Sequence, residues 1–264
     1  MIFWNISNRR TRIKNADIFF ISLGKSGRTW IRTFVNKYFS IKYNTPFHLY
    51  LTDETEKEWK NIFFTHELWE HYTKATFPQR LTGKYIIPNK YLRSKKSIFL
   101  YRDPRDIVTS LYYQMTKRSS SSQSFSKHEF IRHEVYGIQN IISTLNKWHA
   151  RLYGLNNSLW NSYENFLLDP YTNFFNLAYF IESKHPQMDA FEQSLSFSDF
   201  KNMQNLEKND SFNTSILRPK NINDPNSFKV RKGKIGGYLD EFSDEDINYM
   251  NHELQNLHPF FNYK

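Results

Sequence analysis

Cysteine is absent from this sequence of 264 residues. A chain without thiols has no disulfide scaffold, no thiolate nucleophile and no zinc or iron–sulfur site built on cysteine. Long apolar runs are also missing. None approaches the ~18 residues of a membrane span, and the first dozen residues lack the ~7 continuous apolar residues of a signal peptide. We therefore expect a soluble, cytoplasmic protein without a membrane span.

The composition indicates a folded and basic protein. Hydrophobic residues make up 39% of the chain and aromatic residues 18%, enough apolar material to exclude disorder throughout. Lys and Arg number 36 against 26 Asp and Glu, which gives a net charge of +10. This excess suits nucleic acid, an anionic membrane surface or a small ligand with several phosphates. Composition alone does not choose among these partners, nor does it exclude a basic surface that serves only solubility.

Short apolar segments alternate with amphipathic ones along the chain. Strands are predicted where β-branched and aromatic residues are concentrated, at residues 17–23, 61–65, 96–101 and 159–163. Helices are predicted at 28–39, after Pro104 with Asp103 as N-cap, and from the fourth strand through Phe180. This alternation predicts an α/β fold with a central parallel sheet flanked by helices.

The remaining sequence gives no sign of a second domain. Residues 119–126 and 208–226 lack apolar periodicity and are predicted to be surface loops. We hypothesise that the first of these loops gates a ligand pocket. No internal repeat or break in composition divides the chain, so we expect one domain over 1–264 with its core at about 17–251.

The first segment with chemical character is G-K-S-G-R-T-W, residues 24–30, between a predicted strand and a predicted helix. Glycines let a backbone approach a ligand closely, and helix N-terminal N–H groups bind anions. A nucleoside-triphosphate P-loop also requires Gly five positions before the glycine of G-K-S. Phe19 occupies that position, so the sequence predicts a P-loop-like phosphate-binding loop of another kind.

Two further segments carry clustered cations. Residues 102–110, R-D-P-R-D-I-V-T-S, open at the carboxyl end of a predicted strand, where ligands of open α/β sheets bind. Residues 231–237, R-K-G-K-I-G-G, combine three cations with three glycines, as in a loop that closes over an anion. Taken alone, either segment is more typical of a solvated basic surface than of a ligand site.

His66 follows a predicted strand in the sequence T-H-E-L-W-E-H. Glu70 stands where the zinc motif H-E-x-x-H has its second histidine, so a metal site is not predicted. A histidine at a strand end is a candidate general base, because its ordinary pKa is near neutrality.

Together and in this order, these segments resemble the sulfotransferase family that uses 3′-phosphoadenosine 5′-phosphosulfate (PAPS). Residues 24–30 are similar to the family's opening motif P-K-S-G-T-T-W, and residues 231–236 match R-K-G-x-x-G. Residues 102–113 are similar to its motif of Arg, a Ser eight residues later and an aromatic pair. Residues 163–170 are similar to its Y-E-D-L…D-P segment. The resemblance extends from about residue 17 to about residue 251.

The resemblance implies PAPS as the donor of a sulfuryl group and assigns a role to each matching residue. The 5′-phosphosulfate would contact Lys25, Ser26, Gly27, Arg28 and Thr29. Trp30 would stack near the adenine and Tyr163 would contact it. The 3′-phosphate would contact Arg102, Ser110, Arg231, Lys232 and Gly233. His66 matches the catalytic base, Lys25 would stabilise the leaving phosphate oxygen, and no metal is expected.

The chain departs from the family at two positions near the expected reaction. Arg28 stands where many members have Thr, and Phe64 stands where members often have a second Lys, two residues before the histidine. A second catalytic cation is therefore absent or comes from elsewhere in the chain. The acceptor is expected to be a sugar, a lipid or another small molecule with a hydroxyl. Aromatic candidates for its pocket walls are Phe64, Trp69, Tyr72, Tyr112 and Tyr113.

Other functions remain open from the sequence. A P-loop-like kinase for a small molecule would require Mg²⁺, and a basic nucleic-acid-binding protein would show steep salt dependence. Nucleic acid is not the expected partner, because the basic residues lie in ligand-site motifs at predicted strand ends. A sulfotransferase-like protein that binds nucleotide without catalysis is a further alternative, and the oligomeric state is open.

Overall fold

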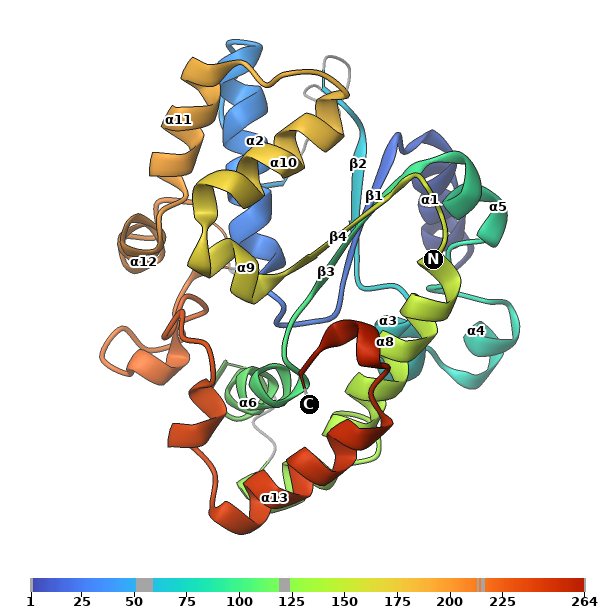
Figure 1. The fold of residues 1–264 in the computed structure, drawn as a ribbon, viewed down its shortest axis with the longest axis vertical. Helices are drawn as coiled ribbons and strands as arrows, with labels where there is room; N and C mark the ends of the chain where they lie inside the picture. The colour runs from blue at the N-terminus through green and yellow to red at the C-terminus, as the bar shows by residue number, and fades with distance from the viewer. Residues whose placement is uncertain (1, 51–58, 119–123, 213, 215–216, 264) are drawn as a thin grey trace.

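The computed structural model describes residues 2–50, 59–118, 124–212, 214 and 217–263 (Figure 1). Its strands are β1 (Ile18–Ser22), β2 (Ile62–Thr65), β3 (Lys96–Tyr101) and β4 (Ser158–Ser162). The helices before β4 are α1 (Ile2–Asn15), α2 (Arg28–Lys42), α3 (Trp69–Thr73), α4 (Phe77–Leu81), α5 (Asn89–Ser94), α6 (Pro104–Tyr113), α7 (Lys127–Arg132) and α8 (Ile138–Leu152). Those after it are α9 (Tyr163–Leu168), α10 (Pro170–Glu182), α11 (Met188–Phe197), α12 (Phe200–Lys208) and α13 (Asp244–Glu253).

The four strands form one parallel sheet in the order β2-β1-β3-β4. Ile18 of β1 pairs with Ile62 of β2 on one side and with Lys96 of β3 on the other. The parallel sheet and the helices between its strands confirm the α/β fold predicted from the sequence. Because the strands are parallel, the loops that follow them all leave from the same edge of the sheet.

Helices cover both faces of the sheet, so β1 is buried on both sides. Phe19 and Ile21 pack with α6, α8 and α13, whereas Ile18 and Phe20 pack with α2, α10 and α11. Alternate residues of a strand point to opposite faces, which explains why this strand is apolar throughout. In Figure 1, α2, α10 and α11 lie on one side of the strands, and α1, α5 and α8 lie on the other.

Capping residues begin helix α6 at the position expected from the sequence. Asp103 caps α6, because its side chain accepts a hydrogen bond from the backbone N–H of Arg105, and Pro104 is the first helical residue. The prediction of a strand at 159–163 followed by one helix was wrong in two details. Tyr163 begins α9, and the helical segment is broken where Asp169 caps α10 at Pro170.

The two predicted loops have different outcomes. Residues 119–123 lie outside the described residues, so the structure does not test a gate there; Ser126 is the N-cap of α7 and forms a capping box with Glu129. The segment at 208–226 begins one residue later than predicted, because Lys208 ends α12. It is not wholly a surface loop, since Leu217 is buried against Leu49 and Met203.

We expect Phe34→Ala to lower the free energy of unfolding by about 3–5 kcal/mol, the usual cost of removing a buried phenylalanine ring. Phe34 is 1% exposed, and its ring centroid lies 4.3 Å from that of Phe174. Phe77→Ala is the matched control, because Phe77 is 74% exposed and its replacement should change stability by less than about 0.5 kcal/mol. Urea denaturation measures both variants, and equal losses would contradict the assigned core.

Candidate active site

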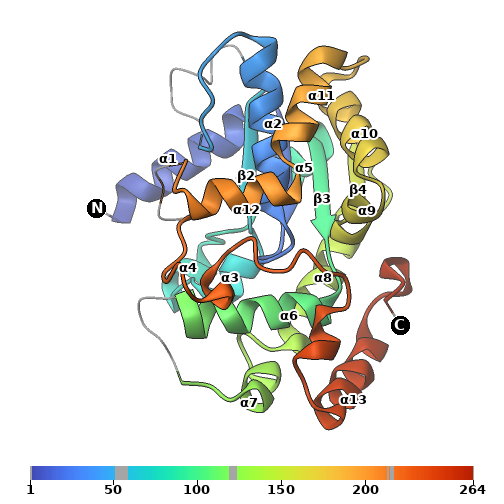
Figure 2. The same ribbon diagram turned by 90° about the vertical axis from the view of Figure 1, so that its left-hand side faces the viewer.

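The loops at the carboxyl edge of the sheet converge on one cavity of about 570 Å³. The 24–27 loop follows β1, His66 follows β2 and Arg102 follows β3. In Figure 2 the arrowhead of β3 points down toward α6, the helix that starts just after Arg102. Residues 229–234 complete the walls from the C-terminal part of the chain. Every site residue predicted from the sequence lines this cavity except Ser26, which is buried behind the loop.

The loop after β1 has a backbone that only certain residues can adopt. Gly27 has a φ of 89°, and a Cβ at this position would lie 2.5 Å from the ring of Tyr163. Glycine is therefore required both for the left-handed conformation and for the close approach of Tyr163. Gly27 offers no side-chain cap to α2, so the first N–H groups of that helix are available to an anion.

Two side chains of this loop have unsatisfied polar groups. The hydroxyl oxygen of Ser26 is buried and forms no hydrogen bond with any described residue. The ammonium of Lys25 donates a hydrogen bond of 3.3 Å to the side-chain oxygen of Gln114. Burial, together with the nearby charges of Arg118 and Arg102, lowers the pKa of Lys25 to about 7. An anion in the cavity would satisfy the Ser26 hydroxyl and compensate the Lys25 charge.

Arg102 connects the loop after β1 with the C-terminal segment. Its guanidinium donates to the carbonyl oxygens of Lys25 at 3.2 Å and Lys234 at 3.4 Å, and it lies 3.6 Å from the carboxylate of Asp106. It stacks 4.2 Å from the ring centroid of Tyr163. Its Nε is buried without a hydrogen-bond partner among the described residues. Ser110 lines the same cavity two helical turns further along α6.

Buried carboxylates hold the 229–238 segment over the cavity. Glu207 is 0% exposed and accepts hydrogen bonds from the backbone N–H groups of Lys229 at 2.6 Å and Val230 at 2.8 Å. Asp106 accepts from the N–H groups of Gly236 at 3.0 Å and Tyr238 at 3.1 Å. The segment that the sequence predicted to be a closing loop is thus fixed at both ends by side chains of α12 and α6.

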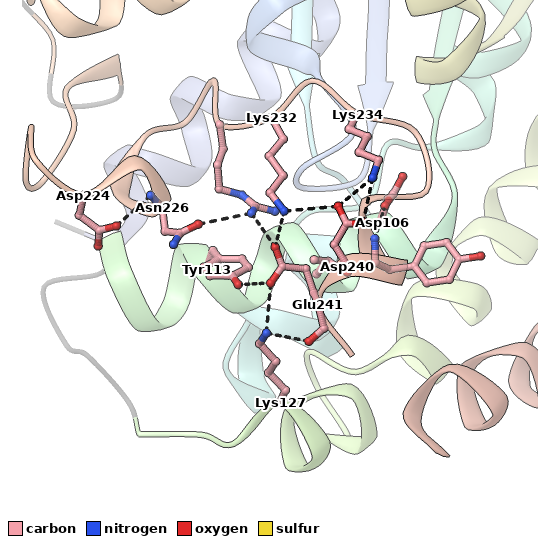
Figure 3. Close-up of polar contacts among 12 residues, drawn as sticks. Asp106, Tyr113, Lys127, Asp224, Asn226, Lys232, Lys234, Asp240 and Glu241 are labelled. Carbon is pink, nitrogen blue, oxygen red and sulfur yellow. Dashed lines mark hydrogen bonds and ion pairs between the residues drawn. The ribbon is translucent and has the colours of Figure 1, made fainter. Parts of the chain in front are cut away.

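Arg231 and Lys232, the predicted ligands of a 3′-phosphate, are already paired with a carboxylate (Figure 3). The distances to Glu241 are 3.1 Å from Arg231 and 2.7 Å from Lys232. Glu241 also accepts hydrogen bonds from Tyr113 and Lys127. An incoming phosphate would share these two cations with Glu241 rather than meet them unpaired.

His66 lines the cavity with a defined tautomer. Its Nδ1 lies 2.7 Å from the backbone carbonyl oxygen of Ser22, which can only accept, so Nδ1 carries the proton and Nε2 has the lone pair. Burial lowers the pKa of His66 well below its ordinary value, and the charge of Arg28 lowers it further. The imidazole is therefore neutral near pH 7 and able to accept a proton at Nε2.

Two cations of the site were missed by the sequence analysis. Lys229 lines the cavity and forms no ion pair with a described residue; burial and the charge of Lys25 lower its pKa well below the ordinary value. Arg118 lies 3.5 Å from Glu207 and ends the π-helical turn η1 (Gln114–Arg118), a rare element often found at functional sites. Lys229 stands two residues before the R-K-G motif, which is the signal that could have identified it.

The aromatic residues expected around an acceptor are only partly present in this cavity. Trp69 lines it, but the other four do not. Phe64 faces away, with its ring centroid 4.9 Å from that of Phe20 and the guanidinium of Arg32 at 4.4 Å. Tyr113 is bonded to Glu241 instead.

The described residues contain neither a cluster of metal ligands nor a membrane-spanning helix. No three His, Asp or Glu side chains in this part of the chain lie together as metal ligands would. None of the helices in the same ranges has the length and apolar character needed to cross a membrane.

The chain is similar to known proteins in sequence and in fold. A family model described as "Sulfotransferase domain" matches residues 15–257. Retinol dehydratase in complex with androsterone and the inactive cofactor PAP has a TM-score of 0.63 and 16% identity, over 91% of this chain and 80% of that one. A mouse sulfotransferase complexed with PAP has a TM-score of 0.62 and 15% identity, over 91% and 84%. No curated protein sequence matches significantly.

We predict that Glu241→Gln lowers the free energy of unfolding at pH 7 by about 1–3 kcal/mol, the cost of losing a charged hydrogen-bond partner. Burial by itself would raise the pKa of Glu241, but hydrogen bonds from Lys232, Tyr113 and other neighbours lower it to about 2. Because the folded pKa lies below the unfolded value of 4.5, this stabilisation is present above pH 4.5 and disappears as the pH falls toward 2.

Urea denaturation of the wild type and the variant at neutral and acidic pH measures this effect. The stability difference should be largest at neutral pH and shrink in acid. Glu192→Gln is the control, since Glu192 is exposed and its replacement should change stability by less than about 0.5 kcal/mol. A Glu241→Gln difference that does not change with pH would contradict the assigned ion-pair cluster.

Proposed function

The chain belongs to the sulfotransferase family, and from that premise we propose that it transfers a sulfuryl group from PAPS to an acceptor hydroxyl. The acceptor is a small molecule, a glycan or a lipid. One observation carries the proposal. A single cavity unites the neutral base His66 with the ammonium groups of Lys25 and Lys229, neither of which forms an ion pair with a described residue. Such a cavity suits a donor with several negative charges and a reaction that needs a base.

The donor is proposed to bind along the carboxyl edge of the sheet. Its 5′-phosphosulfate contacts the side chains and N–H groups of Lys25, Ser26, Gly27, Arg28 and Thr29. Its 3′-phosphate contacts Arg102, Ser110, Arg231, Lys232 and Gly233. Trp30 and Tyr163 flank the adenine. The names of two similar structures state that each is a complex with PAP, the 3′,5′-bisphosphate product.

The residues present fit such a donor. The buried hydroxyl of Ser26 and the buried Nε of Arg102 have no hydrogen-bond partner among the described residues, and phosphate oxygens would supply acceptors to both. Lys229 adds a cation that the sequence analysis did not include, and we propose that it joins Lys25 in binding the donor.

His66 is proposed as the general base. Its Nε2 removes the proton of the acceptor hydroxyl while the hydroxyl oxygen forms a bond to sulfur. The bond between sulfur and the phosphate oxygen of the donor breaks in the same step, and PAP keeps the bonding electrons. The products are the sulfated acceptor, PAP and a protonated His66, which returns its proton to solvent.

Lys25 is proposed to stabilise the charge that develops on the leaving phosphate oxygen. Phe64 occupies the place of the family's second Lys but faces α2 and the ring of Phe20. Arg28 lines the same cavity as His66, and its charge adds to burial in lowering the pKa of that histidine. We propose that Arg28 supplies the positive charge that a Lys at position 64 would otherwise give.

A small acceptor is consistent with the similar structures. Androsterone and retinol accompany PAP in two complexes of retinol dehydratase. Trp69, Leu111 and Met115 give the cavity an apolar wall, and apolar walls with a few polar groups are typical of small-molecule sites.

We expect calorimetric titration to show tight binding of PAP and weak binding of AMP, which lacks the 3′-phosphate. Arg102→Ala should weaken PAP binding by about ten- to a hundredfold, the effect of losing charged hydrogen bonds. Arg93→Ala is the control, because Arg93 is exposed on α5. Preference for ADP with Mg²⁺ over PAP would contradict the proposal and favour a kinase.

We expect His66→Ala to lower kcat by about 10²- to 10⁴-fold, the usual contribution of a general base, without changing PAP affinity. PAP release from PAPS, with a panel of phenols, alcohols and sugars as acceptors, measures turnover. Because the pKa of His66 lies well below 6.5, the acid limb of kcat/KM should fall below pH 6.5. His252→Gln, on an exposed position of α13, should have no effect. Full activity of His66→Ala would contradict the role of His66 as the general base and would mean that another group removes the proton.

A further inference from the structure

A second cavity, of about 440 Å³, adjoins the first on the side of α1 and β2. It shares three residues with the larger cavity: Arg28, His66 and Glu70. Its other walls come from α1, the end of β2 and the turn between α4 and α5. Of the residues proposed to hold the donor, it includes Arg28 alone. His66 thus borders the donor cavity on one side and a separate space on the other.

Cations outnumber carboxylates around this second cavity. Its carboxylates are both paired: Glu67 forms an ion pair with Arg9, and Glu70 lies 2.9 Å from the ammonium of Lys74. Three of its cations form no ion pair with a residue in the described ranges. They are Arg12, Arg28 and Lys84.

Arg28 is the least compensated of the three. Its guanidinium forms neither a hydrogen bond nor an ion pair with the described residues. Burial and the charge of Arg32 together lower the pKa of Arg28 to about 9, although the carboxylate of Glu70 opposes the shift. Placing a charge in a buried position without a partner is costly, so a bound anion at this point would stabilise the protein.

The cations of the second cavity are held against flat aromatic rings. The guanidinium of Arg12 lies 5.3 Å from the ring centroid of Phe63, and that of Arg9 lies 5.8 Å from the ring centroid of Tyr85. The ammonium of Lys84 lies 5.1 Å from the same tyrosine ring. Such contacts fix the direction of the charges, and rings beside polar groups suit the flat faces of a sugar.

We propose that the acceptor carries an anionic group of its own, a carboxylate or a phosphate, which binds in this second cavity to Arg12, Arg28 and Lys84. This inference rests on the proposed function, since it places the acceptor hydroxyl at His66 and the anionic group beyond it. Arg12 comes from α1, which therefore contributes to acceptor specificity. The substrate class is an acidic hydroxylated molecule, such as a uronate or a sugar phosphate.

The test is a titration of the protein, saturated with PAP, with three probes: glucose, glucuronate and glucose 6-phosphate. The charged sugars are expected to bind at least about tenfold more tightly than glucose, the effect of charged hydrogen bonds. The stronger of the two charged probes shows whether carboxylate or phosphate is preferred. Equal binding of all three, or binding by neither charged probe, would overturn the proposal.

The Arg12→Gln variant tests whether the charged sugar binds in this cavity or responds only to the overall positive charge of the protein. It should weaken binding of the preferred charged sugar by about two- to fivefold, the value of an exposed ion pair, and leave glucose and PAP unchanged. Arg10→Gln is the matched control, because Arg10 is an exposed neighbour on the same helix outside both cavities. Equal effects of the two substitutions would overturn the assignment of the cavity.

The initial titration with PAP distinguishes failure of the proposed function from failure of the anionic acceptor alone. Absence of PAP binding overturns the proposed function and, with it, the anionic acceptor. Binding of PAP without preference for a charged sugar overturns the anionic acceptor alone and leaves the proposed function intact.

Discussion

The buried carboxylate of Glu207 is the contact on which the cationic site depends. Its two oxygens hold the N–H groups of Lys229 and Val230, and its charge faces Arg118 at 3.5 Å. Without it, Arg118 would lose this carboxylate partner, and the backbone at Lys229 and Val230 would lose its anchor. Asp106 does the same for the far end of the segment, at Gly236 and Tyr238. Because the anchoring is through the backbone, the Lys229 ammonium has no carboxylate partner among the described residues.

The lowered pKa values of Lys25 and Lys229 have the same physical origin. Each ammonium is buried beside other cations, so its charged form is destabilised until an anion binds. A polyanionic donor would restore the charge balance and satisfy the Ser26 hydroxyl at the same time. In the proposed function, affinity for the donor and the capacity to stabilise a leaving phosphate oxygen would therefore come from one arrangement of charges.

His66 links this arrangement to the second cavity. The Ser22 carbonyl fixes the Nδ1 proton, and burial, aided by the charge of Arg28, lowers the pKa of the ring so that it is neutral. Both cavities meet at the same imidazole and the same guanidinium. In the proposed function, His66 would be a base at the boundary between a donor space and an acceptor space, the geometry that a direct transfer needs.

The sequence by itself determined the structural features that depend on residues close together in the chain. The apolar runs of β1 and β3, the cap at Asp103 and the glycine at position 27 are local signals, and each stands where it was predicted. The parallel order of strands then brings their loops to one edge, which is why the predicted site residues share a cavity. Tertiary structure alone decided the contacts between distant segments. Glu207 with Lys229, Glu241 with Arg231 and Arg12 with Phe63 pair residues whose spacing follows no helical or strand period. Charge pairing across a fold depends on which surfaces pack together, and no local pattern of residues encodes that.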